Sequence, residues 1–157
     1  MESLGFVLKT DVCWGAQELL QLRCEEVKMA KTFMQMAAEA MAEVPGLAPA
    51  EAQKRMKEDP RTLMVDVRDA ADTHTTGLIP GAVNVSLGMI PVRADQELPL
   101  EWRDARLQDR SRPIITTCAL GPNGARGAKI LKDMGFTSVH YLAGGMQAGK
   151  DAGLPTE

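Results

Sequence analysis

The sequence has few of the residues that mark disulfide-rich or metal-binding proteins. Only three of its 157 residues are cysteine and two are histidine. Cys13 and Cys24 lie in one segment and Cys118 lies far from both, which is not the spacing of a disulfide framework. Sparse cysteines favour a reducing, cytoplasmic compartment. His74 and His140 form no metal-ligand spacing with these cysteines, so we expect no metal site.

The sequence also lacks an excess of positive charge and any long apolar run. It contains 18 Lys and Arg against 21 Asp and Glu, so no surplus of cations exists to neutralise the phosphates of a nucleic acid. No apolar run is long enough to cross a bilayer. The start, MESLGFVLKTDVCW, has no basic region followed by an apolar one and does not predict a secretory signal. The remaining composition, 45% hydrophobic and 25% charged, is typical of a globular domain.

We predict that residues 1–44 form a helical extension and that residues 45–157 form the main domain. Between about Asp11 and Val44 the chain has no proline and a single glycine. Apolar or small residues recur there at steps of three and four, which is typical of one face of a helix. This stripe comprises Leu20, Val27, Ala30, Met34, Ala37, Met41 and Val44, and Phe33 and Ala40 widen it. Pro45 and Gly46 then end the helix.

An apolar stripe of this length must be covered, because soluble monomers rarely expose a continuous apolar patch. Three alternatives are open: the helix packs on its own domain, it pairs with a second copy in a homodimer through residues 24–44, or the extension is partly disordered. The small residues of the stripe would let two helices approach closely. Met29 is also a candidate natural start, which would make the residues before it unimportant.

Residues 45–157 alternate between short strands and helices, and contain no internal repeat. Strands are expected at 62–67 (TLMVDV), 82–85 (AVNV), 113–118 (PIITTC) and 138–142 (SVHYL). Helices are expected at 50–58, around 100–107, at 124–134 and after Gly144 and Gly145. Strands separated by helical stretches indicate βαβ units, so the pattern predicts an α/β domain with a mostly parallel sheet.

Cys118 is the one cysteine placed for nucleophilic chemistry, in the string PIITTCALGPNGARGAKILKDMGF. A β-branched strand ends at Cys118, a tight loop follows, and Asn123 is a candidate N-cap for the next helix, which Gly135 ends. Ligands of open α/β sheets bind at the carboxyl ends of strands, and loop amides at a helix N-terminus attract anions. This setting favours the thiolate, the reacting form of cysteine. A buried structural cysteine is the alternative.

Three motifs together resemble those of rhodanese-type sulfurtransferase domains over about residues 46–155. They are VDVRDAADTHTTGLIPGAVNV, TTCALGPNG and FTSVHYLAGGMQAGKDAGLP. The resemblance implies a rhodanese-like, mostly parallel five-stranded sheet with helices on both faces, to which the N-terminal helix is added. It also implies a reaction in which a thiolate takes the outer sulfur of thiosulfate or another small anionic donor. The resulting persulfide passes its sulfur to cyanide or a thiol acceptor, and no cofactor or metal is implied.

Several residues match the motifs of this family. Cys118 corresponds to the nucleophile. The loop that would hold the persulfide or the donor anion corresponds to Ala119, Leu120, Gly121, Pro122, Asn123 and Gly124. Asp66 and Arg68 match an Asp-Val-Arg element and are expected to form a structural pair that fixes the loop. Arg126 either attracts an anionic donor to the mouth of the site or is an ordinary solvated residue.

The sequence departs from the family pattern at three positions. Asn123 stands where many of these loops have Arg or Ser, Leu78 where histidine is frequent, and Gly149 where tryptophan is frequent. The first departure puts the substrate preference in question but not the chemistry. Two other functions stay open: a non-catalytic protein-binding module, and a cysteine phosphatase or arsenate reductase. The latter chemistry requires an arginine six residues after the cysteine, where this chain has Gly124.

Overall fold

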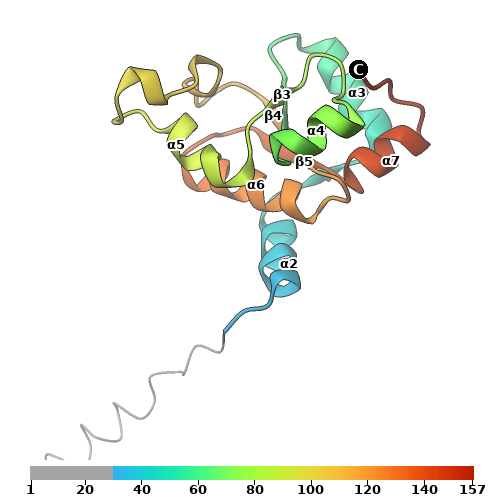
Figure 1. Cartoon of the computed structure of the whole chain (residues 1–157), viewed down its shortest axis with the longest axis horizontal. Helices are drawn as coiled ribbons and strands as arrows, with labels where there is room; N and C mark the ends of the chain where they lie inside the picture. The colour runs from blue at the N-terminus through green and yellow to red at the C-terminus, as the bar shows by residue number, and fades with distance from the viewer. Residues whose placement is uncertain (1–29) are drawn as a thin grey trace, which may run out of the picture. The chain divides into compact units, whose positions relative to one another are not determined.

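The computed structural model describes residues 30–157 (Figure 1). The predicted helical segment before residue 30, including Cys13 and Cys24, lies outside the described residues. Residues Thr32–Glu157 form one compact unit, which therefore begins before the predicted boundary at residue 44. Within the described part of the chain, no helix has the length and apolar character that a membrane crossing requires.

A five-stranded, entirely parallel sheet lies at the centre of this unit. The strands occur in the order β1 (Gly46–Leu47), β5 (Val139–Leu142), β4 (Ile114–Thr117), β2 (Leu63–Asp66) and β3 (Val83–Asn84). The four strands expected from the sequence are confirmed, each slightly shorter than predicted. The two-residue β1 was not expected from its residues because it is too short to show a period. Asp66 pairs with Thr117, so the residues that follow β2 and β4 meet at one sheet edge.

Helices cover both faces of the sheet, which confirms the predicted fold class (Figure 1). Alternate residues of a strand point to opposite faces. Leu63 and Ile114 accordingly join the apolar cluster beneath α5 (Ile90–Ala94) and α6 (Pro122–Asp133). The neighbouring Met64 and Ile115 join the cluster beneath α3 (Pro49–Glu58) and α7 (Gly145–Asp151). The remaining helical pieces are α4 (Ala70–Thr76), η1 (Leu87–Met89), η2 (Leu100–Trp102) and η3 (Ala105–Leu107).

The described part of the N-terminal helix, α2 (Phe33–Glu43), begins later than the sequence pattern indicated. Thr32 is its N-cap: the Thr32 hydroxyl accepts from the Gln35 amide, and the Gln35 side chain accepts from the Thr32 amide. This capping box holds Thr32 in an extended conformation, which a continuous helix cannot contain. The prediction of one unbroken helix through residues 30–32 was therefore wrong.

Helix α2 packs against α6 of the same compact unit, so self-packing is the alternative that the structure shows for this segment. The residues that face the domain are small, with Ala37 and Ala40 fully buried and Val44 nearly so. Lys132 of α6 donates to the carbonyl oxygen of Glu43 at 2.8 Å. Met34 is 62% exposed, so this part of the predicted stripe is not covered by the domain. The homodimer through residues 24–44 stays a prediction.

The predicted helix around residues 100–107 was wrong. The segment instead contains the two 3-10 turns η2 and η3. Asp104 interrupts any longer helix, because its side chain accepts from the Arg106 amide and caps η3. Short polar side chains that bond their own backbone compete with helix formation in this way.

Candidate active site

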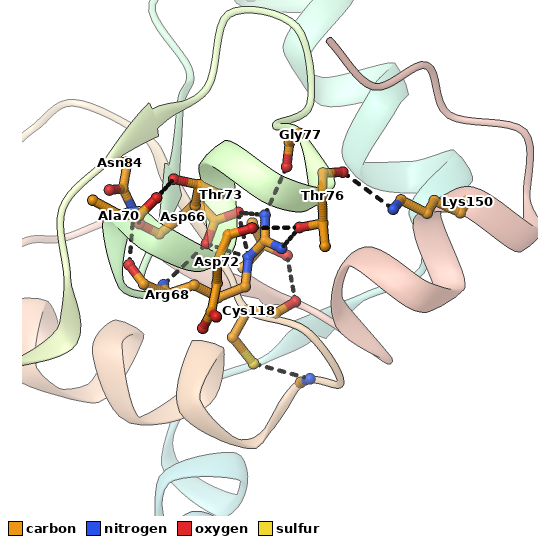
Figure 2. Close-up of polar contacts among 12 residues, drawn as sticks. Asp66, Arg68, Ala70, Asp72, Thr73, Thr76, Gly77, Asn84, Cys118 and Lys150 are labelled. Carbon is orange, nitrogen blue, oxygen red and sulfur yellow. Dashed lines mark hydrogen bonds and ion pairs between the residues drawn. The ribbon is translucent and has the colours of Figure 1, made fainter.

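Cys118 lies at the carboxyl end of β4, as its place in the sequence predicted. The residue is only 5% exposed, and it is a free thiol. Its sulfur accepts a hydrogen bond from the Gly121 amide at 3.1 Å (Figure 2). Within residues 30–157 this is the only hydrogen bond to the sulfur. The sulfur therefore already interacts with the type of donor that stabilises a thiolate.

Helix α6 begins at Pro122, two residues before the predicted start. Gly121 is the N-cap, and Pro122 occupies the first helical position, where a missing N–H is harmless. Asn123 lies within the first turn, so its prediction as N-cap was wrong. Its Oδ1 accepts instead from Nη1 of Arg126 at 3.0 Å. At the other end of the helix, Gly135 lies directly after the C-cap, as expected.

The loop after Cys118 contains fewer possible hydrogen-bond donors than its length suggests. Pro122 has no N–H and cannot contribute one. The residues of the predicted loop that carry amides are Ala119, Leu120, Gly121, Asn123 and Gly124. The amides of the first helical turn have no partner within their own helix. An anion at the mouth of this loop can therefore accept from backbone amides without requiring a particular side chain.

The first turn of α7 is hydrogen-bonded to the backbone of Cys118 and Ala119. The amide of Met146 donates to the Cys118 carbonyl at 2.7 Å, and the amide of Gln147 donates to the Ala119 carbonyl at 3.0 Å. Gly145 makes this approach possible, because a Cβ there would overlap the Cys118 carbonyl oxygen. Two carbonyls of the loop thus satisfy two helix amides that otherwise lack partners. The arrangement fixes the backbone on which the sulfur is carried.

Replacing Gly145 with alanine should decrease the free energy of unfolding by about 3 kcal/mol or more. The change combines an unfavourable φ of 60° with overlap against the loop backbone. Gly81→Ala is the matched control, since Gly81 has a φ of 76° and nothing within 4 Å of the added Cβ. The control should lose only about 1 kcal/mol. Equal losses in urea unfolding would show that the close approach to Cys118 contributes nothing.

Asp66 and Arg68 form the buried ion pair that their motif predicted. Nη2 of Arg68 lies 2.6 Å from Oδ2 of Asp66, and the two side chains are 8% and 0% exposed. Arg68 also donates to the Thr76 hydroxyl and to the Gly77 carbonyl, as Figure 2 shows. The hydrogen bonds that Arg68 donates to the Asp66 carboxylate raise the pKa of Arg68 above its usual value, and the charge of a Cys118 thiolate acts in the same direction. The guanidinium therefore stays charged beside the site.

Asn84, at the end of β3, also supports this pair and was not expected from the sequence. Its side-chain amide donates to the carbonyls of Asp66 at 3.0 Å and of Arg68 at 2.8 Å (Figure 2). Both bonds hold the turn that leaves β2. Asparagine is depleted in strands, so its place in the string AVNV was a signal for a special role.

A depression of about 600 Å³ lies over Cys118. Its lining includes Cys118, Leu120 and Asn123 from the loop, together with Arg68 and Arg126. Phe33 from α2 also lines it, although the sequence pattern had placed this residue on the helix stripe. Among the described residues, no group of three or more His, Cys, Asp or Glu is arranged to hold a metal ion.

The fold and the site together define a cysteine-bearing, parallel α/β domain with an amide loop at the carboxyl end of its central strand. A model of the rhodanese-like domain family matches residues 48–152, which is most of the chain. The chain therefore belongs to the rhodanese-like domain family, whose members often are sulfurtransferases.

Two curated proteins and one solved structure illustrate the similarity. The chain is 27% identical over 104 residues to a rhodanese domain-containing protein of Drosophila melanogaster, covering 62% of this chain and 90% of the fly protein. It is 26% identical over 86 residues to the mouse thiosulfate sulfurtransferase/rhodanese-like domain-containing protein 3, covering 53% of this chain. That match spans about half of the mouse protein, 54%.

The solved structure is a protein of unknown function from Rhodopseudomonas palustris, described as a possible tyrosine phosphatase. It is 28% identical to this chain, with a TM-score of 0.75. The match covers 82% of this chain and 96% of the Rhodopseudomonas palustris protein. The 110 residues from 48 to 157 make up 70% of the chain, which is less than the 82% that the structural similarity covers. The structural similarity therefore extends to residues before 48, where α2 lies.

Proposed function

We propose that this protein is a sulfurtransferase that carries sulfane sulfur as a persulfide on Cys118, in a reducing, cytoplasmic setting. The observation that supports this most is the position of the sulfur. It lies at the carboxyl end of β4, accepts the Gly121 amide, and lines the depression ahead of α6. The donor is a small anionic sulfur compound such as thiosulfate, and the acceptor is a thiol or cyanide.

The proposed reaction has two steps. The Cys118 thiolate attacks the outer sulfur of thiosulfate, the sulfur–sulfur bond of the donor breaks, and sulfite leaves with the bonding electron pair. Cys118 then carries a terminal sulfur with one negative charge. Cyanide attacks this outer sulfur, thiocyanate leaves, and the thiolate is restored. The loop amides stabilise the negative charge on the terminal sulfur, as fixed amides stabilise other developing anions.

Intact-mass measurement of the protein after incubation with thiosulfate tests this proposal. A Cys13→Ser/Cys24→Ser variant retains Cys118 as its only cysteine and removes competing thiols. We expect its mass to increase by one sulfur atom and to return to the starting value after cyanide is added. No added sulfur would contradict the proposal and favour a non-catalytic binding module.

The description of the Rhodopseudomonas palustris structure makes phosphatase activity the second candidate. That chemistry requires an arginine six residues after the cysteine to bind the phosphate with two hydrogen bonds. Gly124 occupies this position, and a Cβ added to it would lie 3.4 Å from backbone atoms of Thr117 and Cys118. We therefore expect no hydrolysis of p-nitrophenyl phosphate above the rate of a Cys118→Ser variant. Hydrolysis that depends on Cys118 would instead support the phosphatase.

If Arg126 attracts the anionic donor, Arg126→Ala should raise the KM for thiosulfate by about threefold to tenfold at low salt and change kcat less. Arg126 lines the depression and is half-buried. Dissolved ions screen charges over about 8 Å at physiological ionic strength, so the effect should shrink as salt is added. Lys54→Ala removes an equal charge from an exposed position on α3 and should leave KM unchanged. An unaltered KM in Arg126→Ala at low salt would assign this side chain to the solvated surface.

A further inference from the structure

One wall of the depression over Cys118 comes from outside the region that defines the family. Phe33, the first residue of α2, lines the depression, whereas the family model begins at residue 48. The Phe33 side chain is 44% exposed, so part of its ring is available to a ligand. The guanidinium of Arg126 lies over this ring, 5.6 Å from its centre. An aromatic ring and a cation thus stand together beside the nucleophile.

The position of Phe33 is held by several independent contacts. The capping box of Thr32 and Gln35 fixes the turn in which Phe33 lies. Further along α2, Ala37 and Ala40 are fully buried against the domain. Arg126 is held in turn by its hydrogen bond to Asn123. The wall is therefore a built part of the site and not a loosely attached side chain.

The depression is larger and more apolar than a small inorganic donor requires. Its volume is about 600 Å³, within the range typical of pockets for organic ligands of moderate size. Thiosulfate has only five atoms and no apolar group. The apolar part of the lining includes Phe33, Val67, Leu87, Leu120 and Pro122. This lining suits a molecule that has a carbon group beside its anionic sulfur.

We propose that α2 is a specificity element, in which Phe33 selects organic sulfur donors over inorganic ones. The inference rests on the sulfurtransferase function proposed above. The donor has an anionic sulfane sulfur attached to an apolar, preferably aromatic, group. The apolar group lies against the ring of Phe33, and the anionic head lies between Arg126 and the loop that follows Cys118.

An aryl thiosulfonate is the simplest compound with these features. The Cys118 thiolate attacks its terminal sulfur, and the bond between the terminal and sulfonyl sulfurs breaks. The aryl sulfinate leaves with the electron pair, and Cys118 becomes the same persulfide that thiosulfate produces. Because both donors lead to one intermediate, any difference between them arises in donor recognition and in the first step.

The test compares benzenethiosulfonate with thiosulfate as donors, with cyanide as the acceptor and thiocyanate as the product measured. Phe33→Ala should lower kcat/KM for benzenethiosulfonate by about fivefold to tenfold, because an aromatic contact is lost. It should change kcat/KM for thiosulfate by less than about twofold, because thiosulfate has no apolar group. Phe33→Leu, which keeps an apolar side chain, should show a smaller loss with benzenethiosulfonate only.

Met36→Ala is the matched control, since Met36 is 37% exposed on the same helix and does not line the depression. It should leave both donors unchanged, and thermal unfolding should show that all variants are folded. An equal loss for both donors in Phe33→Ala and Phe33→Leu would overturn the inference and assign Phe33 a structural role. No change for either donor would also overturn it. In both cases intact mass would still show the persulfide, whereas its absence with both donors would refute the sulfurtransferase function itself.

Discussion

Replacing Cys118 with serine should reduce sulfur transfer from thiosulfate to cyanide by a factor of about 10³ or more. A serine hydroxyl is not ionised near neutral pH and cannot carry a stable terminal sulfur. The replacement is nearly the same size as the original. Because the sulfur makes its one described hydrogen bond with the Gly121 amide, which a hydroxyl can also accept, the fold should be preserved.

The measurement is the steady-state production of thiocyanate, together with thermal unfolding of the same samples. Cys13→Ser and Cys24→Ser serve as controls for general thiol chemistry, and each should retain nearly full activity. Cys118→Ser should unfold at nearly the same temperature as the original protein. Transfer that survived the replacement of Cys118 in a folded protein would place the chemistry elsewhere in the chain.

The second large effect is expected on stability, at the ion pair beside the site. Asp66→Asn removes the charge from a fully buried carboxylate while keeping its shape, and leaves the Arg68 guanidinium without its negatively charged partner. Breaking one side of a buried ion pair is strongly destabilising, so we expect the free energy of unfolding to fall by about 3–5 kcal/mol. Urea unfolding, with the midpoint and slope both determined, measures this change.

The chain contains an exposed pair with the same spacing, which makes a matched control. Arg61 donates its amide and its guanidinium to Asp59, as Arg68 does to Asp66. The Arg61 and Asp59 side chains are 67% and 36% exposed, so water already solvates both charges. Asp59→Asn should therefore have a much smaller effect than Asp66→Asn. Similar losses in the two variants would show that burial does not strengthen the pair beside Cys118.

The sequence by itself determined four of the five strands and the position of Cys118 at the end of one of them. The strands around Val65 and Ile115 are runs of apolar, partly β-branched residues. Polar and turn residues bound each run, and short runs of this kind indicate buried strands. The strand ending at Cys118 and the helix after it are adjacent in the chain. Their meeting at the sulfur is therefore local, and local patterns contain enough information to predict it.

The sequence was less reliable at the ends of helices, where neighbouring residues are alternative caps. Asn123 is a good N-cap by residue type, yet Gly121 caps α6 because Pro122 is suited to the first helical position. Thr32 likewise makes α2 begin later than the apolar stripe indicated, through its reciprocal bonds with Gln35. Periodicity shows which face of a helix is apolar, but the cap residues decide where the helix begins.

Only the tertiary structure decided what surrounds Cys118. Phe33 and Cys118 are far apart in the sequence, and no local pattern relates them. They line one depression because the small residues Ala37 and Ala40 let α2 pack closely on the domain. The α7 amides that hold the Cys118 carbonyl likewise come from a distant segment. Contacts of this kind depend on how the helices pack on the sheet, so they determine the walls of the depression, whereas the local sequence determines the position of the Cys118 sulfur.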